Sequence, residues 1–182
     1  ITNAWSTEPS MPTARGLFGC AIVGNNIYCI GGATMNASPF SLTEMYNIIT
    51  QEWQTITPMS QSKFHFGCTS VGSMLYCIGG STGTQIVNSN IVLDTSSNSW
   101  STKTPMPTNK YEFGCTSVGS MIYCIGGSQA TSQPIMRIVE GYNVHTNQWT
   151  TLAPMLKPAK MFRCVNINNH LYCLGGLSMM GN

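Results

Sequence analysis

The chain has 182 residues, of which only 8% are charged, far below the roughly 25% usual for soluble domains. Eight Lys and Arg oppose six Asp and Glu, and the formal net charge of +2 argues against nucleic-acid or membrane-surface partners. No apolar run approaches the roughly 18 residues of a transmembrane helix, so we expect no membrane insertion.

One stretch of sequence occurs four times and organises the chain. Its first copy, residues 18–32, predicts two short strands folded on a tight turn, with a cysteine in each strand and Gly-Gly at the end. The other copies are residues 66–80, 113–127 and, with changes, 162–176. The tryptophans recur at steps of 48, 47 and 49, at Trp5, Trp53, Trp100 and Trp149. A period in the forties indicates an array of small supersecondary units.

Each period predicts four short strands. After the hairpin and a polar loop, the third strand is expected at 41–48, with counterparts at 89–95 and 136–144. A turn opened by Asn or Asp follows. The fourth strand carries the tryptophan, as in residues 52–57, and a Pro-Met pair then leads to the next unit. No segment has a helical period, so the predicted fold class is all-β.

These features together resemble kelch repeats over essentially the whole chain. The resemblance is carried by Ile-Tyr-Cys-Ile-Gly-Gly at 27–32, by Tyr46 and Tyr142 on the third strand, and by Trp about six residues beyond the turn. Leu93 departs from the third-strand tyrosine. The resemblance implies a β-propeller with one four-stranded antiparallel blade per repeat of about 47–49 residues, here an incomplete set of about four blades.

The predicted organisation is a segment of such a propeller. Its units are 1–8 (fourth strand of a split blade), 9–57, 58–104 and 105–153 (blades), and 154–182 (first hairpin of a further blade). The chain begins at Ile1, without an initiator Met or a signal-peptide pattern, so we interpret it as part of a longer or processed product. An unusual four-bladed ring and closure through a neighbouring molecule are the alternatives. Uncovered blade faces would favour self-association.

The eight cysteines form four pairs, each nine residues apart, and no Cys-x-x-Cys occurs, which argues against zinc. With Gly24-Asn25 as a type II′ loop, Cys20 faces Cys29, and Asn168-Asn169 suits a type I′ turn in the fourth copy. This register favours disulfides, each contributing about 2.5 kcal/mol, over buried free thiols. They imply an oxidising compartment, secreted or lumenal. The predicted bonds are Cys20–Cys29, Cys68–Cys77, Cys115–Cys124 and Cys164–Cys173.

A glycosylation sequon supports the same compartment. Asn36-Ala37-Ser38 lies in the loop after the first Gly-Gly, and we predict a glycan on Asn36 if the source is eukaryotic.

Few residues in the sequence could serve as catalytic groups. His65, His145 and His170 stand at unrelated positions of the repeat, and no nucleophile motif or phosphate loop appears. We therefore expect no enzyme activity, no cofactor and no metal. Some secreted kelch propellers are enzymes, so a part of such an enzyme is an alternative.

A binding role is better supported. The loops after Gly-Gly, at 33–39, 81–88, 128–134 and from Leu177, are polar and differ between units, whereas the hairpins are nearly constant. The expected function is an extracellular or lumenal module that binds a protein or glycan, and the alternative is a subunit of a filament, coat or matrix. Basic residues between units form a candidate binding rim, with local hydrogen bonding as the alternative role. They are Arg15, Lys63, Lys110, Lys157 and Lys160.

Overall fold

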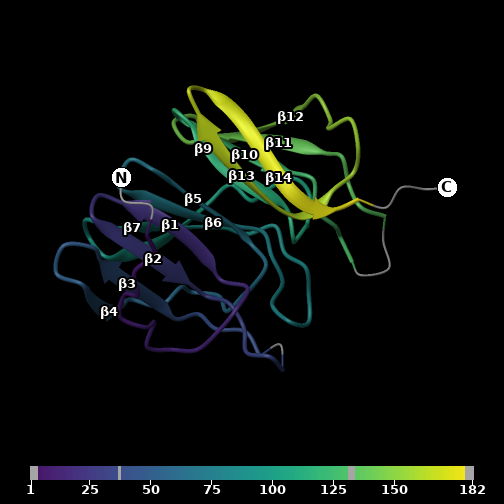
Figure 1. Ribbon diagram of the computed structural model, residues 1–182. Coiled ribbons are helices and arrows are strands. Elements are labelled where there is room, and N and C mark those ends of the chain that lie inside the picture. The colour runs from purple at the N-terminus through teal and green to yellow at the C-terminus, as the bar shows by residue number, and fades with distance from the viewer. Residues whose placement is uncertain (1–3, 37, 131–133, 179–182) are drawn as a thin grey trace.

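The structure is a computed structural model that describes residues 4–36, 38–130 and 134–178. Within these residues the chain forms fourteen β-strands and no helix, arranged as four antiparallel sheets around a common centre (Figure 1). The predicted all-β fold is confirmed. The strands are β1 (Gly19–Val23), β2 (Asn26–Ile30), β3 (Thr43–Asn47), β4 (Glu52–Ile56), β5 (Gly67–Val71), β6 (Met74–Ile78), β7 (Asn90–Asp94), β8 (Ser99–Lys103), β9 (Gly114–Val118), β10 (Met121–Ile125), β11 (Val139–Asn143), β12 (Gln148–Leu152), β13 (Lys160–Ile167) and β14 (His170–Leu177).

Each sheet is one repeat, and we call the sheets blades 1 to 4 in chain order. The first three blades have four strands in sequence order, and the described part of the last has only β13 and β14. The first strand of each blade is innermost: β1 contacts β5, β5 contacts β9, and β9 contacts β13. No comparable contact returns from β13 to β1 within the described residues. The described chain is therefore an open row of blades.

The hairpin register predicted from the turns is confirmed. Cys20 pairs with Cys29 and Val23 with Asn26, which leaves a two-residue loop. Gly24 has φ +57° and Asn25 has no positive φ, as a type II′ turn requires. In blade 4 both Asn168 (φ +50°) and Asn169 (φ +62°) are left-handed, as in a type I′ turn.

Neighbouring blades are joined by a phenylalanine that enters a socket made of two glycines. The ring of Phe66, which precedes the inner strand of blade 2, packs against Gly19 and Gly31 of blade 1. A Cβ added to Gly19 would lie 2.7 Å from the Cβ of Cys68, a distance that real side chains essentially never show. The same socket holds Phe113 against Gly67 and Gly79, and Phe162 against Gly114 and Gly126.

Apolar clusters continue each socket between the blades. Between blades 1 and 2, for example, buried Tyr28 and Ile30 pack with Leu75 and Leu93. The core therefore consists of layers between successive blades, which explains why the strands of one blade are apolar on both faces.

The tryptophans of the fourth strands tie each blade to the segment that enters it. The indole N–H donates at 2.9 Å from Trp53 to the Pro9 carbonyl, from Trp100 to the Thr57 carbonyl, and from Trp149 to the Thr104 carbonyl. This repeated bond accounts for the tryptophan period in the sequence.

The structure differs from prediction at the start of the chain and in some strand lengths. Residues 4–8 form no strand, Trp5 is fully exposed, and none of the described strands lies beside them to supply backbone partners. Residues 1–3 of that predicted strand lie outside the described residues. The third strands are shorter than expected, for example β3 at Thr43–Asn47 instead of 41–48.

Candidate binding face

Loops from two parts of each repeat meet at one end of the blades, and we call this end the loop face. The segment before each inner strand bridges the loop after the Gly-Gly pair, at Gly16 with Ala33, Phe64 with Ser81, and Tyr111 with Ser128. The variable loops and the loops between blades therefore form one continuous surface.

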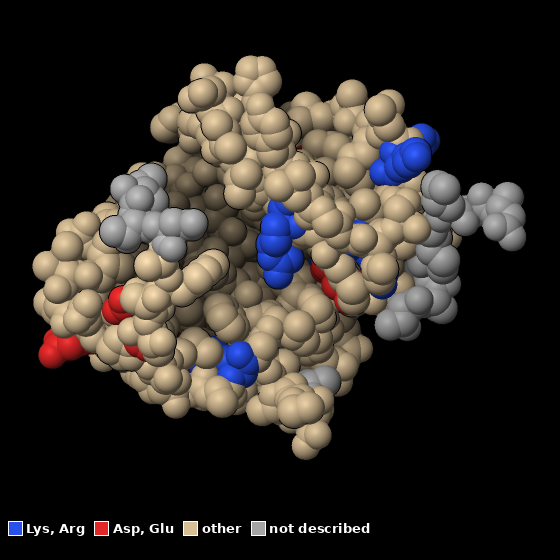
Figure 2. Space-filling view, viewed as in Figure 1, with Lys and Arg blue, Asp and Glu red and all other residues tan. Residues whose placement is uncertain are grey.

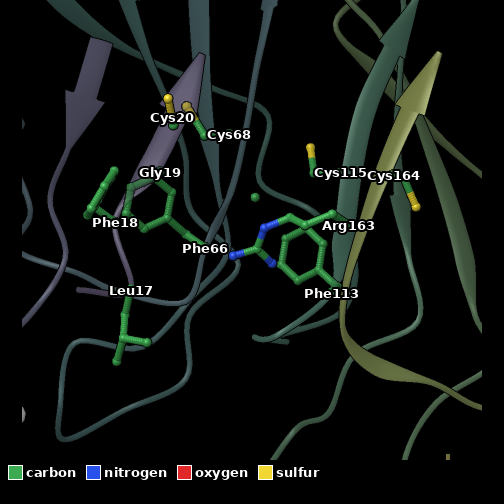
Figure 3. A pocket seen from close by; sticks show the side chains of 11 residues that line it. Leu17, Phe18, Gly19, Cys20, Phe66, Cys68, Phe113, Cys115, Arg163 and Cys164 are labelled. Atoms are coloured by element: carbon green, nitrogen blue, oxygen red, sulfur yellow. The ribbon is translucent and has the colours of Figure 1, made fainter. Parts of the chain in front are cut away.

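A hollow of about 460 Å³ lies where the inner strands meet (Figure 3). Its wall is made largely by the repeated Phe-Gly-Cys segments, and Arg163 comes from the last blade. Figure 3 shows the guanidinium of Arg163 directed towards Phe66 and Phe113 across the hollow. Figure 2 shows a face hollowed at its middle on which charged side chains are sparse. The hollow is thus lined by aromatic rings, thiols and backbone with one cation, and its exposed surface is more polar than apolar.

Four residues at the same repeat position link the blades beside this hollow: Leu17, His65, Glu112 and Met161 all have positive φ. Their backbones form a relay in which His65 N donates to Leu17 O (3.0 Å), Glu112 N to His65 O (3.0 Å), and Met161 N to Glu112 O (2.7 Å). Because their side chains share no chemistry, no sequence pattern could have revealed this role.

Charged and titratable side chains also lie close together along this backbone relay, on blades 2 to 4. The Glu112 carboxylate lies 2.8 Å from Lys160 Nζ and 3.7 Å from His65 Nε2. The hydrogen bond to Glu112 raises the pKa of Lys160, whereas burial lowers the pKa of His65. Lys160 is therefore the close cationic partner of Glu112, and the lowered pKa of His65 leaves its imidazole largely neutral at pH 7.

Arg15, Lys63 and Lys110 do not lie on an exposed rim, and this part of the prediction is wrong. Their side chains are fully buried. Each donates to the carbonyl of the second cysteine of its own blade: Arg15 to Cys29 O (2.9 Å), Lys63 to Cys77 O (2.9 Å) and Lys110 to Cys124 O (2.8 Å). Local hydrogen bonding, the alternative role, is the one observed. Lys157 is exposed.

The buried cations have different counter-charges. Arg15 pairs with Glu44, and Lys110 lies 2.9 Å from Glu140. In blade 2 the corresponding third-strand position is Ile91, opposite Cys77, so Lys63 has only carbonyl and hydroxyl acceptors there. Burial lowers the pKa of Lys63 to about 8.

All four cysteine pairs face each other as predicted, and one of the four predicted disulfides is formed. Cys164 and Cys173 are bonded, with their Cα atoms 4.1 Å apart. The other three pairs have the same register but carry free thiols in this structure. Cys20 is exposed, and the hydrogen bond from Cys29 lowers the pKa of Cys20 to about 7. It is the more reactive thiol of its pair.

The remaining predicted sites are placed as follows. Asn36 and Ser38 are exposed on the loop face, and Ala37 lies outside the described residues. Asn36 lines a second hollow of about 430 Å³ together with Met35 and Gly16. His145 and His170 are exposed. The described residues include no group of three or more His, Cys, Asp or Glu that could hold a metal ion, and no helix there could cross a membrane.

The four sheets, their shared inner strands and the socketed phenylalanines define an array of β-propeller blades. A family model described as the KLHDC2/KLHL20/DRC7 Kelch-repeats domain matches residues 2–176, and the chain belongs to the Kelch-repeat family. Domains of this family typically bind protein partners.

A solved structure titled "Structure of YjhT" has the same fold. It matches with a TM-score of 0.82 and 17% identity, covering 95% of this chain and 63% of that chain. At this identity the likeness shows the fold alone, and the chain spans less than two thirds of the similar structure. No curated protein matches the sequence.

Proposed function

We propose that this chain is a non-enzymatic module that binds a protein partner through its loop face. The observation that carries the proposal is the exposure of apolar side chains there. Leu17 beside the central hollow is 45% exposed, and Met35 beside the second hollow is 105% exposed. Exposed apolar side chains beside hollows in a surface with polar loops suit contact with a protein partner.

The chemistry of the face favours a protein segment over a glycan. Phe18 is partly exposed at the wall of the central hollow and offers, with exposed Leu17, apolar contact to a partner side chain, whereas the rings of Phe66 and Phe113 are buried in their sockets. The polar loops around it supply amide and hydroxyl groups for the edge of the contact. The face thus combines exposed apolar side chains with polar loops, as protein-docking surfaces do.

Paired substitutions test this proposal. Leu17→Asp with Met35→Asp places charge on the loop face, and aspartate tolerates the positive φ of Leu17 (59°). Ile48→Asp with Ile49→Asp is the matched control, since both isoleucines are exposed in a turn outside the loop face. Partners are first identified with the unmodified protein, and their affinity for each variant is then measured. We expect the loop-face variant to lose at least tenfold in affinity, about 1.4 kcal/mol, and the control to lose little.

Equal binding by both variants would refute the role of the loop face. If a glycan binds the unmodified protein but not the loop-face variant, the loop face is a glycan-binding site instead.

We also propose that the protein works in an oxidising compartment, outside the cell or in the secretory lumen. The disulfide at Cys164–Cys173 and the opposed positions of the other three cysteine pairs support this location. A glycan on the exposed Asn36 would lie at the edge of the loop face, beside the second hollow.

A further inference from the structure

Blade 2 contains a buried ammonium group that no carboxylate neutralises. The side chain of Lys63 is fully buried, and its Nζ donates to the Cys77 carbonyl (2.9 Å) and to Ser89 Oγ (3.1 Å). Ser89 in turn donates to Gln61 Oε1 (2.8 Å). These groups are uncharged, and among residues 4–36, 38–130 and 134–178 no carboxylate forms an ion pair with Lys63. A buried charge without a counter-charge stabilises any neighbouring group that can become negative.

Blade 3 supplies a natural comparison for blade 2, because residues 66–80 and 113–127 differ at a single position. Lys110 and Lys63 occupy the same place: each Nζ lies 5.2 Å from the centre of a phenylalanine ring and donates to the carbonyl of the second cysteine. On the third strand, however, blade 3 has a carboxylate 2.9 Å from its lysine, and blade 2 has Ile91. The two hairpins therefore hold the same cysteine pair beside a different net charge.

The charge of Lys63 acts on the cysteine pair of its own blade. Burial lowers the pKa of Lys63 to about 8, and negative charge on Cys77 and on Cys68 would raise it again. The hydrogen bond with Cys77 raises the pKa of the Cys68 thiol, so Cys68 keeps its proton when the pair is reduced. Any negative charge on the reduced pair therefore falls on the sulfur of Cys77, the residue whose carbonyl Lys63 already binds.

The two sulfurs of this pair also differ in access. Cys68 is partly exposed and lines the central hollow (Figure 3), whereas Cys77 is fully buried. The inner strand that carries Cys68 is flanked on both sides, by the inner strands of blades 1 and 3. A small molecule in the hollow can therefore reach the Cys68 sulfur but not the Cys77 sulfur.

We propose that Cys68–Cys77 is a thiol–disulfide exchange site, which small thiols such as glutathione open more easily than the equivalent bonds of blades 1 and 3. In those blades the buried cation is already paired, Arg15 with Glu44 and Lys110 with Glu140. In blade 2 the ammonium is left to stabilise the thiolate that reduction produces. A stabilised thiolate is the better leaving group and also favours the reduced pair at equilibrium.

The exchange proceeds in two steps. The thiolate of one small thiol attacks the Cys68 sulfur, the bond between the two cysteines breaks, and its electron pair stays on Cys77 beside Lys63. A second small thiol attacks the mixed disulfide, which releases the oxidised dimer of the small thiol and returns Cys68 as a thiol. The two small thiols lose two electrons, and the cysteine pair gains them.

Redox titration of the whole protein tests this proposal. The protein is oxidised until all four bonds have formed, equilibrated at neutral pH with mixtures of reduced and oxidised glutathione, quenched with acid and alkylated. Peptide mass mapping then gives the reduced fraction of each pair. We expect Cys68–Cys77 to be half reduced at a ratio of squared reduced to oxidised glutathione at least tenfold lower than Cys115–Cys124 requires. After brief reduction, we expect glutathione on Cys68.

Substitutions in blade 2 separate charge from packing. Ile91→Glu gives blade 2 the carboxylate of blade 3 and should remove the tenfold difference. Ile91→Gln has nearly the same size without the charge and should leave the difference in place. Lys63→Met removes the ammonium without a change at position 91, and it should also remove the difference. Circular dichroism of each oxidised variant confirms the fold.

The proposal is overturned if the bonds of blades 2 and 3 are reduced at the same ratio, if Ile91→Glu and Ile91→Gln behave alike, or if Lys63→Met keeps the difference. Glutathione found on Cys77 would overturn the order of attack. Because the protein is oxidised before the titration and no partner is present, this proposal and binding by the loop face can each fail alone.

Discussion

At the scale of single residues, the buried cations before the inner strands occupy the same repeat position but have different counter-charges in different blades. Lys110 and Lys63 donate to equivalent carbonyls at 2.8 and 2.9 Å, yet only Lys110 faces a buried glutamate. The pair Lys110–Glu140 is fully desolvated on both sides. Removing one member of such a pair leaves an uncompensated charge, which costs more than the pair itself contributes.

We therefore predict unequal effects of the same substitution at the two lysines. Lys110→Met should lower the free energy of unfolding by about 3–5 kcal/mol, because it leaves Glu140 buried and unpaired. Lys63→Met should cost about 1–2 kcal/mol, since it removes a donor to the Cys77 carbonyl but also removes a buried charge.

Denaturant unfolding measures both values. Adding Glu140→Ile to Lys110→Met reproduces the apolar residue that blade 2 has at Ile91, and it should recover part of the loss. Equal costs for the two lysine substitutions would contradict the assigned role of Glu140.

At the scale of elements, the Phe-Gly-Cys segment determines the spacing of blades. Its phenylalanine belongs to one interface and its glycine to the next, so successive repeats interlock along the inner strands. The segment was noticed in the sequence as part of a repeated hairpin. Its meaning depends on a contact between residues almost a full repeat apart, which local patterning does not contain.

Two glycine-to-alanine substitutions test this spacing. Gly67→Ala should destabilise the protein by about 1–3 kcal/mol, because the new Cβ would overpack against Phe113 and Cys115. Gly16→Ala is the control, since a Cβ at Gly16 meets nothing within 4 Å, and it should change stability by no more than about 0.5 kcal/mol. Thermal unfolding compares the two. A Gly67→Ala protein as stable as the control would show that the inter-blade contact accommodates a Cβ at this position without loss of stability.

At the scale of the whole molecule, the register of the hairpins determines which disulfide bonds the fold can form. Each cysteine pair lies directly across its hairpin, so the fold permits four disulfides without rearrangement of the strands. Only Cys164–Cys173 is bonded in this structure.

We predict that protein from its native source carries all four bonds. Its intact mass should rise by two hydrogens per bond on complete reduction, and peptide mapping should join each cysteine to the one opposite it. Accessible thiols on Cys20, Cys68 or Cys115 in unreduced native protein would contradict the proposed oxidising compartment.

The sequence alone determined the repeat, the all-β blades and the hairpin register, because turn residues and strand alternation act over a few neighbouring positions. It failed at the basic rim: Arg15, Lys63 and Lys110 appeared as exposed loop cations, but carbonyls of the same blade bury them.

The tertiary structure decided what each repeated position does. It brought the loops into one face and joined Leu17, His65, Glu112 and Met161 in a backbone relay. These properties arise from contacts between repeats. They depend on how closely one blade packs on the next, which no single repeat encodes.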